Sequence, residues 1–185
     1  MIAIKQVTEP AELEGIKKLQ QENLKSSLTT EETSSEGFVT AVYSLEFLQK
    51  MHNAEPSIIA KDGDEVVGYA LVADPSIRHE HDLLSDLFTA IDNTPYRGKL
   101  LKESAYVVVG QLCVSKLYRG QGLVNRMYNY YRDCLSDKFE YCITDIAQDN
   151  PRSLKAHQKA GFEVINTLGY GGIKWDVVLW AWRGD

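Results

Sequence analysis

The feature that most constrains this chain is an apolar segment that passes through a glycine-bearing loop directly into a helix. Residues 106–109 and 112–114 form a nearly continuous apolar run, which is typical of a central strand covered on both faces. Gly110 interrupts the run, and an interior glycine indicates a bulge or a close approach by a ligand. From Gly122 onward, apolar residues recur along one broad helical stripe. The segment therefore predicts an α/β fold in which this helix packs on a sheet.

The loop between the strand and the helix predicts a site for an anionic group. The first turn of a helix leaves several backbone N–H groups unpaired, and the helix dipole adds to their attraction for an anion. The sequence of residues 114–124 fits neither GxxxxGK(S/T) nor GxGxxG, the fingerprints of nucleoside-triphosphate and Rossmann dinucleotide sites. A pyrophosphate without bound magnesium fits this loop better. The alternative is that Gly120 and Gly122 serve only a tight turn.

A second motif begins at Asn150. Asn150 and Pro151 make a good helix start, because asparagine accepts hydrogen bonds from free amides and proline suits the first helical position. Gly161 is typical of a helix end that needs a left-handed residue. Ser153 and His157 are four residues apart, which places both on one face of this helix.

Together these two segments resemble the GNAT family of N-acetyltransferases. The family motif Q/R-x-x-G-x-G/A is matched by Arg119 and Gly122, while Val124 stands where glycine or alanine is usual. The stretch N-P-R-S, followed by H and then G-F, resembles the second motif of the family. The resemblance implies an α/β fold with a mixed, mostly antiparallel central sheet flanked by helices. The chain length fits a single domain over residues 1–185, in which the polar stretch at 74–104 indicates an insertion between strands.

The resemblance further implies acetyl-CoA as the acetyl-donating cosubstrate. It would lie in a V-shaped gap between the strand that ends at Val114 and the strand at 141–146, and we expect the first strand to bend at Gly110. The pyrophosphate would sit on the amides of residues 121–124, and the pantetheine arm would pair with the backbone of residues 112–114. The residues expected to bind acetyl-CoA are Leu112, Cys113, Val114, Arg119, Gly120, Gln121, Gly122, Leu123, Val124, Asn150 and Ser153.

The implied reaction is direct attack of a primary amine on the thioester while both substrates are bound. The amine must be neutral, although a free amine of the lysine type has a pKa near ~10.4, so a base or a desolvating pocket is needed. Many relatives use a tyrosine on the last helix as an acid for the thiolate, and His157 occupies that position. Histidine can donate a proton near neutral pH, so His157 is the expected catalytic residue. The alternatives are that His157 packs beside the cosubstrate or helps to bind the acceptor.

The general base stays open at this stage. Some relatives place a glutamate on the central strand, where this chain has Val108, Val109 and Gln111. Asp145 and Glu103 are candidates, although each is also explained as an ordinary polar residue.

No motif identifies the acceptor, and we expect a small-molecule amine rather than a protein. The acidic cluster Glu31, Glu32 and Glu36 either lines an entrance for a cationic amine or is simply solvated. Because Val124 departs from the motif and no base is evident, the alternative function is a catalytically weak CoA-binding protein or sensor of the same fold. A domain that binds ATP or NAD is disfavoured, since both fingerprints are missing.

Composition excludes several other classes of protein. A net charge of −6 disfavours broad binding to nucleic acid. No window approaches the ~18 apolar residues of a membrane span, and the N-terminus lacks the pattern of a secretory signal, so we expect a cytoplasmic protein. Cys113, Cys134 and Cys142 form no CxxC pair, so we expect reduced, buried thiols, no metal site and no disulfide framework. Cys113 lacks a sign of an activating partner, which disfavours a thiol nucleophile.

The remaining sequence predicts further helices and strands by period and turn residues. They are a strand at 1–7, a helix at 12–24, a hairpin of strands 58–61 and 65–69, a helix near 83–91, and closing strands at 162–168 and 175–182. The last strand carries Trp175, Trp180 and Trp182. These aromatic side chains predict core packing, and the alternatives are an acceptor wall or the seam of a homodimer.

Overall fold

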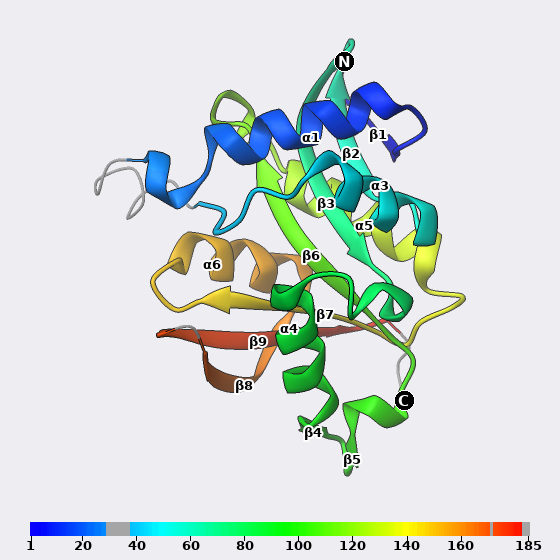
Figure 1. Cartoon of the computed structure of the whole chain (residues 1–185), viewed down its shortest axis with the longest axis vertical. Helices are drawn as coiled ribbons and strands as arrows, with labels where there is room; N and C mark the ends of the chain where they lie inside the picture. The colour runs from blue at the N-terminus through cyan, green and yellow to red at the C-terminus, as the bar shows by residue number, and fades with distance from the viewer. Residues whose placement is uncertain (29–37, 171, 183–185) are drawn as a thin grey trace.

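A computed structural model describes residues 1–28, 38–170 and 172–182. Its centre is a seven-stranded sheet in the order β1-β2-β3-β6-β7-β9-β8, which crosses the molecule in Figure 1. Every neighbouring pair is antiparallel except β6 and β7, which are parallel, so the predicted mixed and mostly antiparallel sheet is confirmed. The strands are β1 (Ala3–Gln6), β2 (Ile58–Asp62), β3 (Glu65–Ala73), β6 (Tyr106–Val114), β7 (Tyr141–Ala147), β8 (Glu163–Tyr170) and β9 (Ile173–Ala181).

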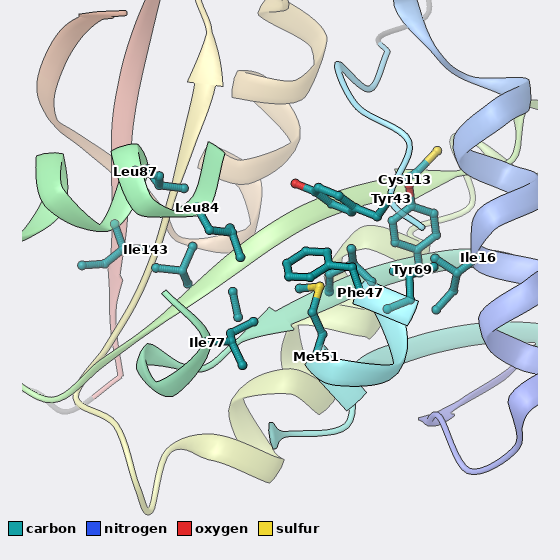
Figure 2. Packing of buried hydrophobic residues seen from close by; sticks show 14 of the residues in the cluster. Ile16, Tyr43, Phe47, Met51, Tyr69, Ile77, Leu84, Leu87, Cys113 and Ile143 are labelled. Carbon is teal, nitrogen blue, oxygen red and sulfur yellow. The ribbon is translucent and has the colours of Figure 1, made fainter. Parts of the chain in front are cut away.

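Helices cover both faces of this sheet. The helices α1 (Pro10–Glu22), α3 (Leu45–Ala54) and α4 (Asp82–Asp92) share one buried cluster with the sheet, part of which Figure 2 shows. On the other face, α5 (Leu123–Leu135) and α6 (Pro151–Ala160) pack over a second cluster. Short elements connect them: η1 (Lys25–Ser27), η2 (Pro75–Ile77), η3 (Leu101–Glu103), η4 (Lys116–Tyr118), and the hairpin of β4 (Pro95–Tyr96) and β5 (Lys99–Leu100).

Most predicted elements are confirmed because their signals are local. The β2–β3 hairpin turns at Gly63, whose φ of 58° is the left-handed conformation that its Asp-Gly sequence predicts. The side chain of Asn150 accepts a hydrogen bond from the amide of Ser153 at the start of α6, and Gly161 ends that helix with a φ of 110°.

Two features of the fold were not predicted from the sequence. Helix α3 has a local signal, because Ser44 accepts a hydrogen bond from the amide of Phe47 and the buried residues Phe47, Leu48 and Met51 recur at helical spacing. The position of β9 between β7 and β8 has no such signal, since it depends on pairing between distant segments.

The bend expected at Gly110 is present as a β-bulge. On β3, the consecutive residues Leu71 and Val72 pair with Gln111 and Val109, so Gly110 is an extra residue on β6. On the other edge of β6, pairing with β7 covers residues 106–108 only and ends at Val108 opposite Ile143, although both strands continue. The two parallel strands therefore separate beyond this point, as the predicted V-shaped gap requires.

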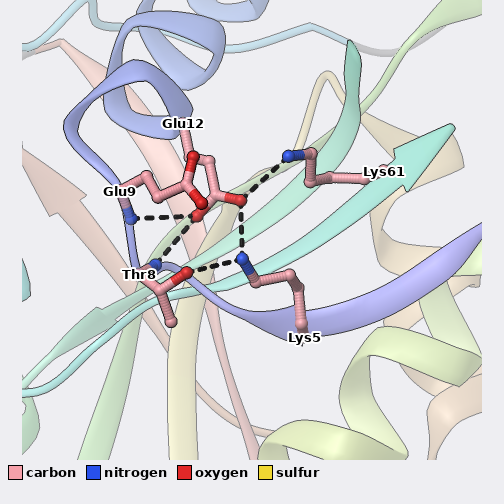
Figure 3. A network of polar contacts seen from close by, with 5 residues as sticks. All are labelled: Lys5, Thr8, Glu9, Glu12 and Lys61. Atoms are coloured by element: carbon pink, nitrogen blue, oxygen red, sulfur yellow. Dashed lines mark hydrogen bonds and ion pairs between the residues drawn. The ribbon is translucent and has the colours of Figure 1, made fainter. Parts of the chain in front are cut away.

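A buried carboxylate fixes the start of α1 on the edge of the sheet. Glu12 is 2% exposed and accepts hydrogen bonds from Lys5 (2.7 Å), from Lys61 (3.1 Å) and from the amides of Thr8 and Glu9 (Figure 3). Burial by itself would raise the pKa of Glu12, but these hydrogen bonds lower it to about 2. The network orients α1, whose other end supports the glycine-bearing loop described below.

Several smaller expectations have mixed outcomes. Cys113 and Cys142 are buried free thiols, whereas Cys134 is only half-buried. Trp180 and Trp182 pack against the second core cluster, as the core interpretation predicts, and Trp175 does not belong to it. Residues 74–104 connect the neighbouring strands β3 and β6 and carry α4, while their origin as an insertion in a single domain stays a prediction. Over the described residues, no helix combines the length and the apolar character needed to cross a bilayer.

Candidate active site

Two adjoining cavities open where β6 and β7 separate. The first, here called the α5 cavity, has a volume of 480 Å³ and lies between the loop at 118–122, the first turn of α5 and the helix α6. The second, here called the α4 cavity, has a volume of 310 Å³ and lies between α4, β7 and β9. Both cavities are lined by Phe38, Val39, Leu112, Asn150 and Ser153. A molecule that fills the α5 cavity can therefore reach the α4 cavity.

The glycine-bearing loop has a backbone that only glycine adopts easily, and it leaves space above it. Gly120 and Gly122 have φ values of 77° and 74°, in the left-handed region. Apart from chain neighbours, no described heavy atom lies within 4 Å of where a Cβ would stand at either glycine. Gly122 begins α5, and none of the described side chains caps this helix start. The turn needs both glycines, and the uncapped amides beside the open space suit an anion.

Arg119 braces this loop through its guanidinium group. Its Nε donates to the backbone oxygen of Val114 (3.0 Å), and its Nη2 donates to Oδ1 of Asn23 (2.7 Å). Asn23 ends α1 and donates in turn to the backbone oxygen of Leu19 (2.9 Å). Arg119 therefore ties β6, the loop and α1 together, and direct contact of its side chain with a phosphate stays a prediction.

Helix α6 adds positive charge to the α5 cavity, which the sequence analysis missed. Arg152, Lys155 and Lys159 line the cavity together with Ala156. A signal was available, because positions 152, 155, 156 and 159 lie on one helical face. These basic side chains supply, in a chain of net charge −6, the local charge that a polyphosphate needs.

Ten of the eleven residues expected to bind acetyl-CoA line the α5 cavity. Gln121 is the exception, since its side chain is exposed and donates to the backbone oxygen of Leu117 (3.2 Å). Cys113 belongs to the cluster on the opposite face, where it lies near Tyr69 (Figure 2), and burial raises the pKa of its thiol to about 11. The un-ionised thiol is consistent with a structural cysteine rather than a nucleophile. The ten lining residues are Leu112, Cys113, Val114, Arg119, Gly120, Gly122, Leu123, Val124, Asn150 and Ser153.

His157 lines the α4 cavity, but both of its ring nitrogens already have partners. Nδ1 lies 2.8 Å from the backbone oxygen of Ser153, which can only accept, so Nδ1 carries the proton. Nε2 then accepts from the hydroxyl of Tyr128 at 2.7 Å. The side chain is 3% exposed, and burial lowers the pKa of His157 from 6.5 to about 4, although the bond to Ser153 acts against this. The imidazole is therefore neutral at pH 7 and fixed between α5 and α6.

The floor of the α4 cavity contains Gln111, which takes part in a buried amide network. Its Oε1 accepts from Nε2 of Gln20 (2.8 Å) and from the hydroxyl of Tyr69 (2.7 Å). Its Nε2 donates to the backbone oxygen of Ala41 (3.0 Å), and the amide of Tyr43 donates to Gln20 (3.0 Å). The position where some relatives place a glutamate thus holds the segment 41–43 against β6.

Asp145 and Glu103, the two candidate bases, lie in different places. Asp145 is half-buried on β7 and lines the α4 cavity. Glu103 is exposed on η3, accepts from the amide of Leu100 (3.1 Å) and lines neither cavity. The cluster of Glu31, Glu32 and Glu36 lies outside the described residues. Within the described ranges, no group of three or more His, Cys, Asp or Glu side chains could hold a metal ion.

A family model described as the acetyltransferase (GNAT) family matches residues 19–162, most of the chain and all of both motifs. The chain belongs to this family. It is therefore a GNAT acetyltransferase, and the family and fold implied by its two motifs are confirmed. A search of curated protein sequences found no significant match.

Solved structures with this GNAT fold span nearly the whole chain. NAA60 of Arabidopsis thaliana in complex with acetyl-CoA is 17% identical with a TM-score of 0.65, and 98% of this chain and 99% of that chain are covered. The putative acetyltransferase yncA of Salmonella typhimurium with acetyl-CoA is 12% identical with a TM-score of 0.66, with coverage of 100% and 96%. The ribosomal-protein-S18-alanine N-acetyltransferase of Escherichia coli is 9% identical with a TM-score of 0.64, with coverage of 100% and 96%. At these identities the likeness concerns the fold.

Proposed function

We propose that this GNAT protein transfers the acetyl group of acetyl-CoA to a primary amine, with both substrates bound at once. The observation that carries the proposal is the meeting of the two cavities where β6 and β7 separate. The α5 cavity would hold acetyl-CoA, and the α4 cavity would hold the amine. Leu112, Asn150 and Ser153, which line both cavities, would surround the reacting groups.

The α5 cavity has the features that a CoA polyphosphate requires. The uncapped first turn of α5 and the open space above Gly120 and Gly122 suit a pyrophosphate. The basic face of α6 offers further charge for phosphate through Lys155 and Lys159. Beyond Val108 the edge of β6 is no longer paired with β7, which leaves it available for the amides of the pantetheine arm.

The rate enhancement would come chiefly from positioning, because direct transfer needs no covalent enzyme intermediate. Bound acetyl-CoA supplies a thioester, and a backbone amide of residues 112–114 would stabilise negative charge on its carbonyl oxygen. The amine nitrogen bonds to the carbonyl carbon, the carbon–sulfur bond breaks, and the nitrogen loses a proton while the thiolate of CoA leaves. We propose Asp145 as the group that accepts the amine proton, since it is the carboxylate among the described lining residues of the α4 cavity.

The proposed part of His157 is to hold α5 and α6 together beside the site. Proton donation by His157 stays a prediction that its geometry does not favour, because the Nδ1 proton points to Ser153 and Nε2 is an acceptor. Packing beside the cosubstrate, the alternative raised by the sequence, agrees better with its burial.

The second candidate function is a CoA-binding protein with little activity. It is favoured by the bonded states of Gln111 and His157, since His157 occupies the position of the acid and Gln111 is one of three strand positions where some relatives place a glutamate. Acetyl-CoA binding without release of CoA thiol, across a broad panel of amines, would support this candidate over an enzyme.

Thermal unfolding with and without acetyl-CoA tests the proposed binding, and a thiol-release assay then tests the transfer. Ligand at about 100 times its dissociation constant should add about 2.7 kcal/mol of stability, or roughly 5 to 10 °C in Tm. We expect this shift with acetyl-CoA and CoA but not with ATP or NAD. No shift at millimolar acetyl-CoA would contradict the proposal.

A further inference from the structure

Among its described lining residues, the α4 cavity combines a single carboxylate with walls that are mainly apolar. Asp145 is the one Asp or Glu among its described lining residues, and no Lys or Arg lines it there. His157, its remaining titratable nitrogen base, is neutral for the reasons given above. The described part of the cavity therefore contains one carboxyl group and no basic side chain.

The carboxylate of Asp145 faces the side of the sheet that carries α4. Alternate residues of a strand share one face, and Asp145 is in step with Tyr141 and Ile143, which belong to the cluster beneath α1, α3 and α4. It lies two residues beyond Ile143, the last β7 residue paired with β6. Tyr43 lines the same cavity. Burial of the Tyr43 hydroxyl raises its pKa, and the nearby carboxylate of Asp145 raises that pKa further, as expected if the two side chains are close.

Apolar side chains from three distant segments surround this charge. Leu84 and Leu87 come from α4, Trp175 comes from β9, and Tyr43 comes from the segment before α3. In Figure 2 the hydroxyl of Tyr43 points away from Tyr69 toward the side where Leu84 lies. Trp175 thus lines the α4 cavity, while Trp180 and Trp182 pack against the second core cluster.

Most polar groups around the cavity are already bonded within the protein. The amide of Gln111 bonds to Tyr69 and Ala41, and Thr144 donates to the backbone oxygen of Val109 (2.8 Å). The side chain of Asn150 donates to the backbone oxygen of Phe38 and caps α6. An acceptor with many amides, hydroxyls or ammonium groups would find few partners here, and burying such groups unpaired is costly.

We propose that the acceptor is a monoamine with an apolar aryl or alkyl body, whose ammonium group is bound by Asp145 and whose body packs on Leu84, Leu87 and Trp175. This inference rests on the proposed acetyl transfer and adds the class of acceptor. A volume of 310 Å³ is at the small end of ligand pockets, which agrees with a compact amine. Polyamines, aminoglycosides and protein N-termini are the acceptors that the proposal disfavours.

The test compares amines that differ in the number of ammonium groups or in the body attached to the amine. Hexylamine and hexamethylenediamine share a chain length but differ by one ammonium group, phenethylamine adds an aromatic body, and a short peptide with a free N-terminus represents proteins. We expect kcat/KM for phenethylamine and hexylamine to exceed that for the diamine and the peptide by at least about tenfold, since one unpaired buried charge costs more than 1.4 kcal/mol. A diamine or peptide preferred over both monoamines would overturn the inference and leave the acetyl transfer standing.

Two variants assign the preference to residues. Asp145→Asn should raise KM for hexylamine at least about tenfold while acetyl-CoA binds as before. Leu83 is 42% exposed and lines the cavity near the start of α4, where an acidic residue is tolerated, so Leu83→Glu should shift the preference toward the diamine. The matched control is Leu45→Glu, because Leu45 is 38% exposed, begins α3 and lines neither cavity. An unchanged preference in Leu83→Glu would contradict the assignment.

A binding measurement separates this inference from the proposed transfer. Calorimetry of phenethylamine with the acetyl-CoA-loaded protein reports acceptor binding even if turnover is slow. Binding that is lost in Asp145→Asn supports the inference without activity, and failure of phenethylamine to bind overturns it. Failure of acetyl-CoA itself to bind contradicts the proposed function instead.

Discussion

His157 and Asp145 both line the α4 cavity, and their surroundings differ. His157 faces α5, is 3% exposed, and has both ring nitrogens bonded to Tyr128 and Ser153. Asp145 faces α4, is half-buried and lines a cavity. The α5 cavity offers backbone amides, glycines and the basic face of α6, whereas the α4 cavity contains one carboxylate among its described lining residues. This contrast underlies the proposals that backbone amides and basic charge bind the common cosubstrate, and that Asp145 and its apolar neighbours select the acceptor.

The largest expected effect concerns the fixed state of His157. Its pKa is about 4 in the folded protein against 6.5 ordinarily, so between these values the unfolded chain binds more protons. Stability from His157 is therefore complete above pH 6.5 and falls as pH drops toward 4, by about 2 to 3 kcal/mol at pH 4.5. Denaturant unfolding of the wild type and His157→Asn at several pH values measures this difference.

The pH window also separates the effect of His157 from that of Glu12, a second group whose pKa is lowered. Glu12 has a pKa lowered from 4.5 to about 2, so its stabilising contribution is lost only below pH 4.5. If the wild type and His157→Asn lose stability in parallel between pH 7 and 4.5, His157 is not held neutral. The contrast with Asp145 would then be lost.

An intermediate effect tests whether the backbone at the start of α5 binds phosphate. Val124→Glu places a carboxylate in the first turn, where the helix itself tolerates an acid. At about 8 Å from a phosphate, and an effective dielectric near 20, the repulsion is about 2 kcal/mol, or about 30-fold in Kd for acetyl-CoA. Calorimetric titration measures this change.

Two matched variants control for side-chain size and for total charge. Val124→Gln changes the size without the charge, and Asn129→Glu adds the same charge at an exposed position of α5 that lines neither cavity. Weakening of acetyl-CoA binding by Asn129→Glu as large as that by Val124→Glu would point to overall charge rather than to a phosphate at this turn.

The smallest expected effect is that of Ser153→Ala. The hydroxyl of Ser153 lies 3.5 Å from Nδ1 of His157, whereas its backbone oxygen lies at 2.8 Å and stays in the variant. We therefore expect a change in the free energy of unfolding within about 0.5 kcal/mol, as measured by denaturant titration. A loss of 1 kcal/mol or more would show that the side chain, rather than the helix backbone, holds the imidazole.

The sequence was most informative where a structure depends on near neighbours. The turn at Gly63, the left-handed glycines at 120 and 122, and the cap at Asn150 each arise within a few residues, so composition and spacing are enough to predict them. The same holds for most of the α5 cavity, because its glycine loop and its helix start are consecutive in the chain. Lys155 and Lys159 were missed although their helical spacing was visible.

Only the tertiary structure placed Asp145 beside Tyr43, Trp175 and α4, and only it joined His157 to Tyr128. These side chains come from segments separated by tens of residues, and packing of the two helical layers on a sheet whose strands β6 and β7 separate beyond Val108 brings them together. By itself the sequence predicted the family, the mixed sheet with its bend and the glycine turn before α5, while the anion site at that turn stays a prediction. How deeply each titratable group is buried and which groups it bonds were decided by long-range packing, because desolvation and hydrogen-bond partners depend on neighbours in space.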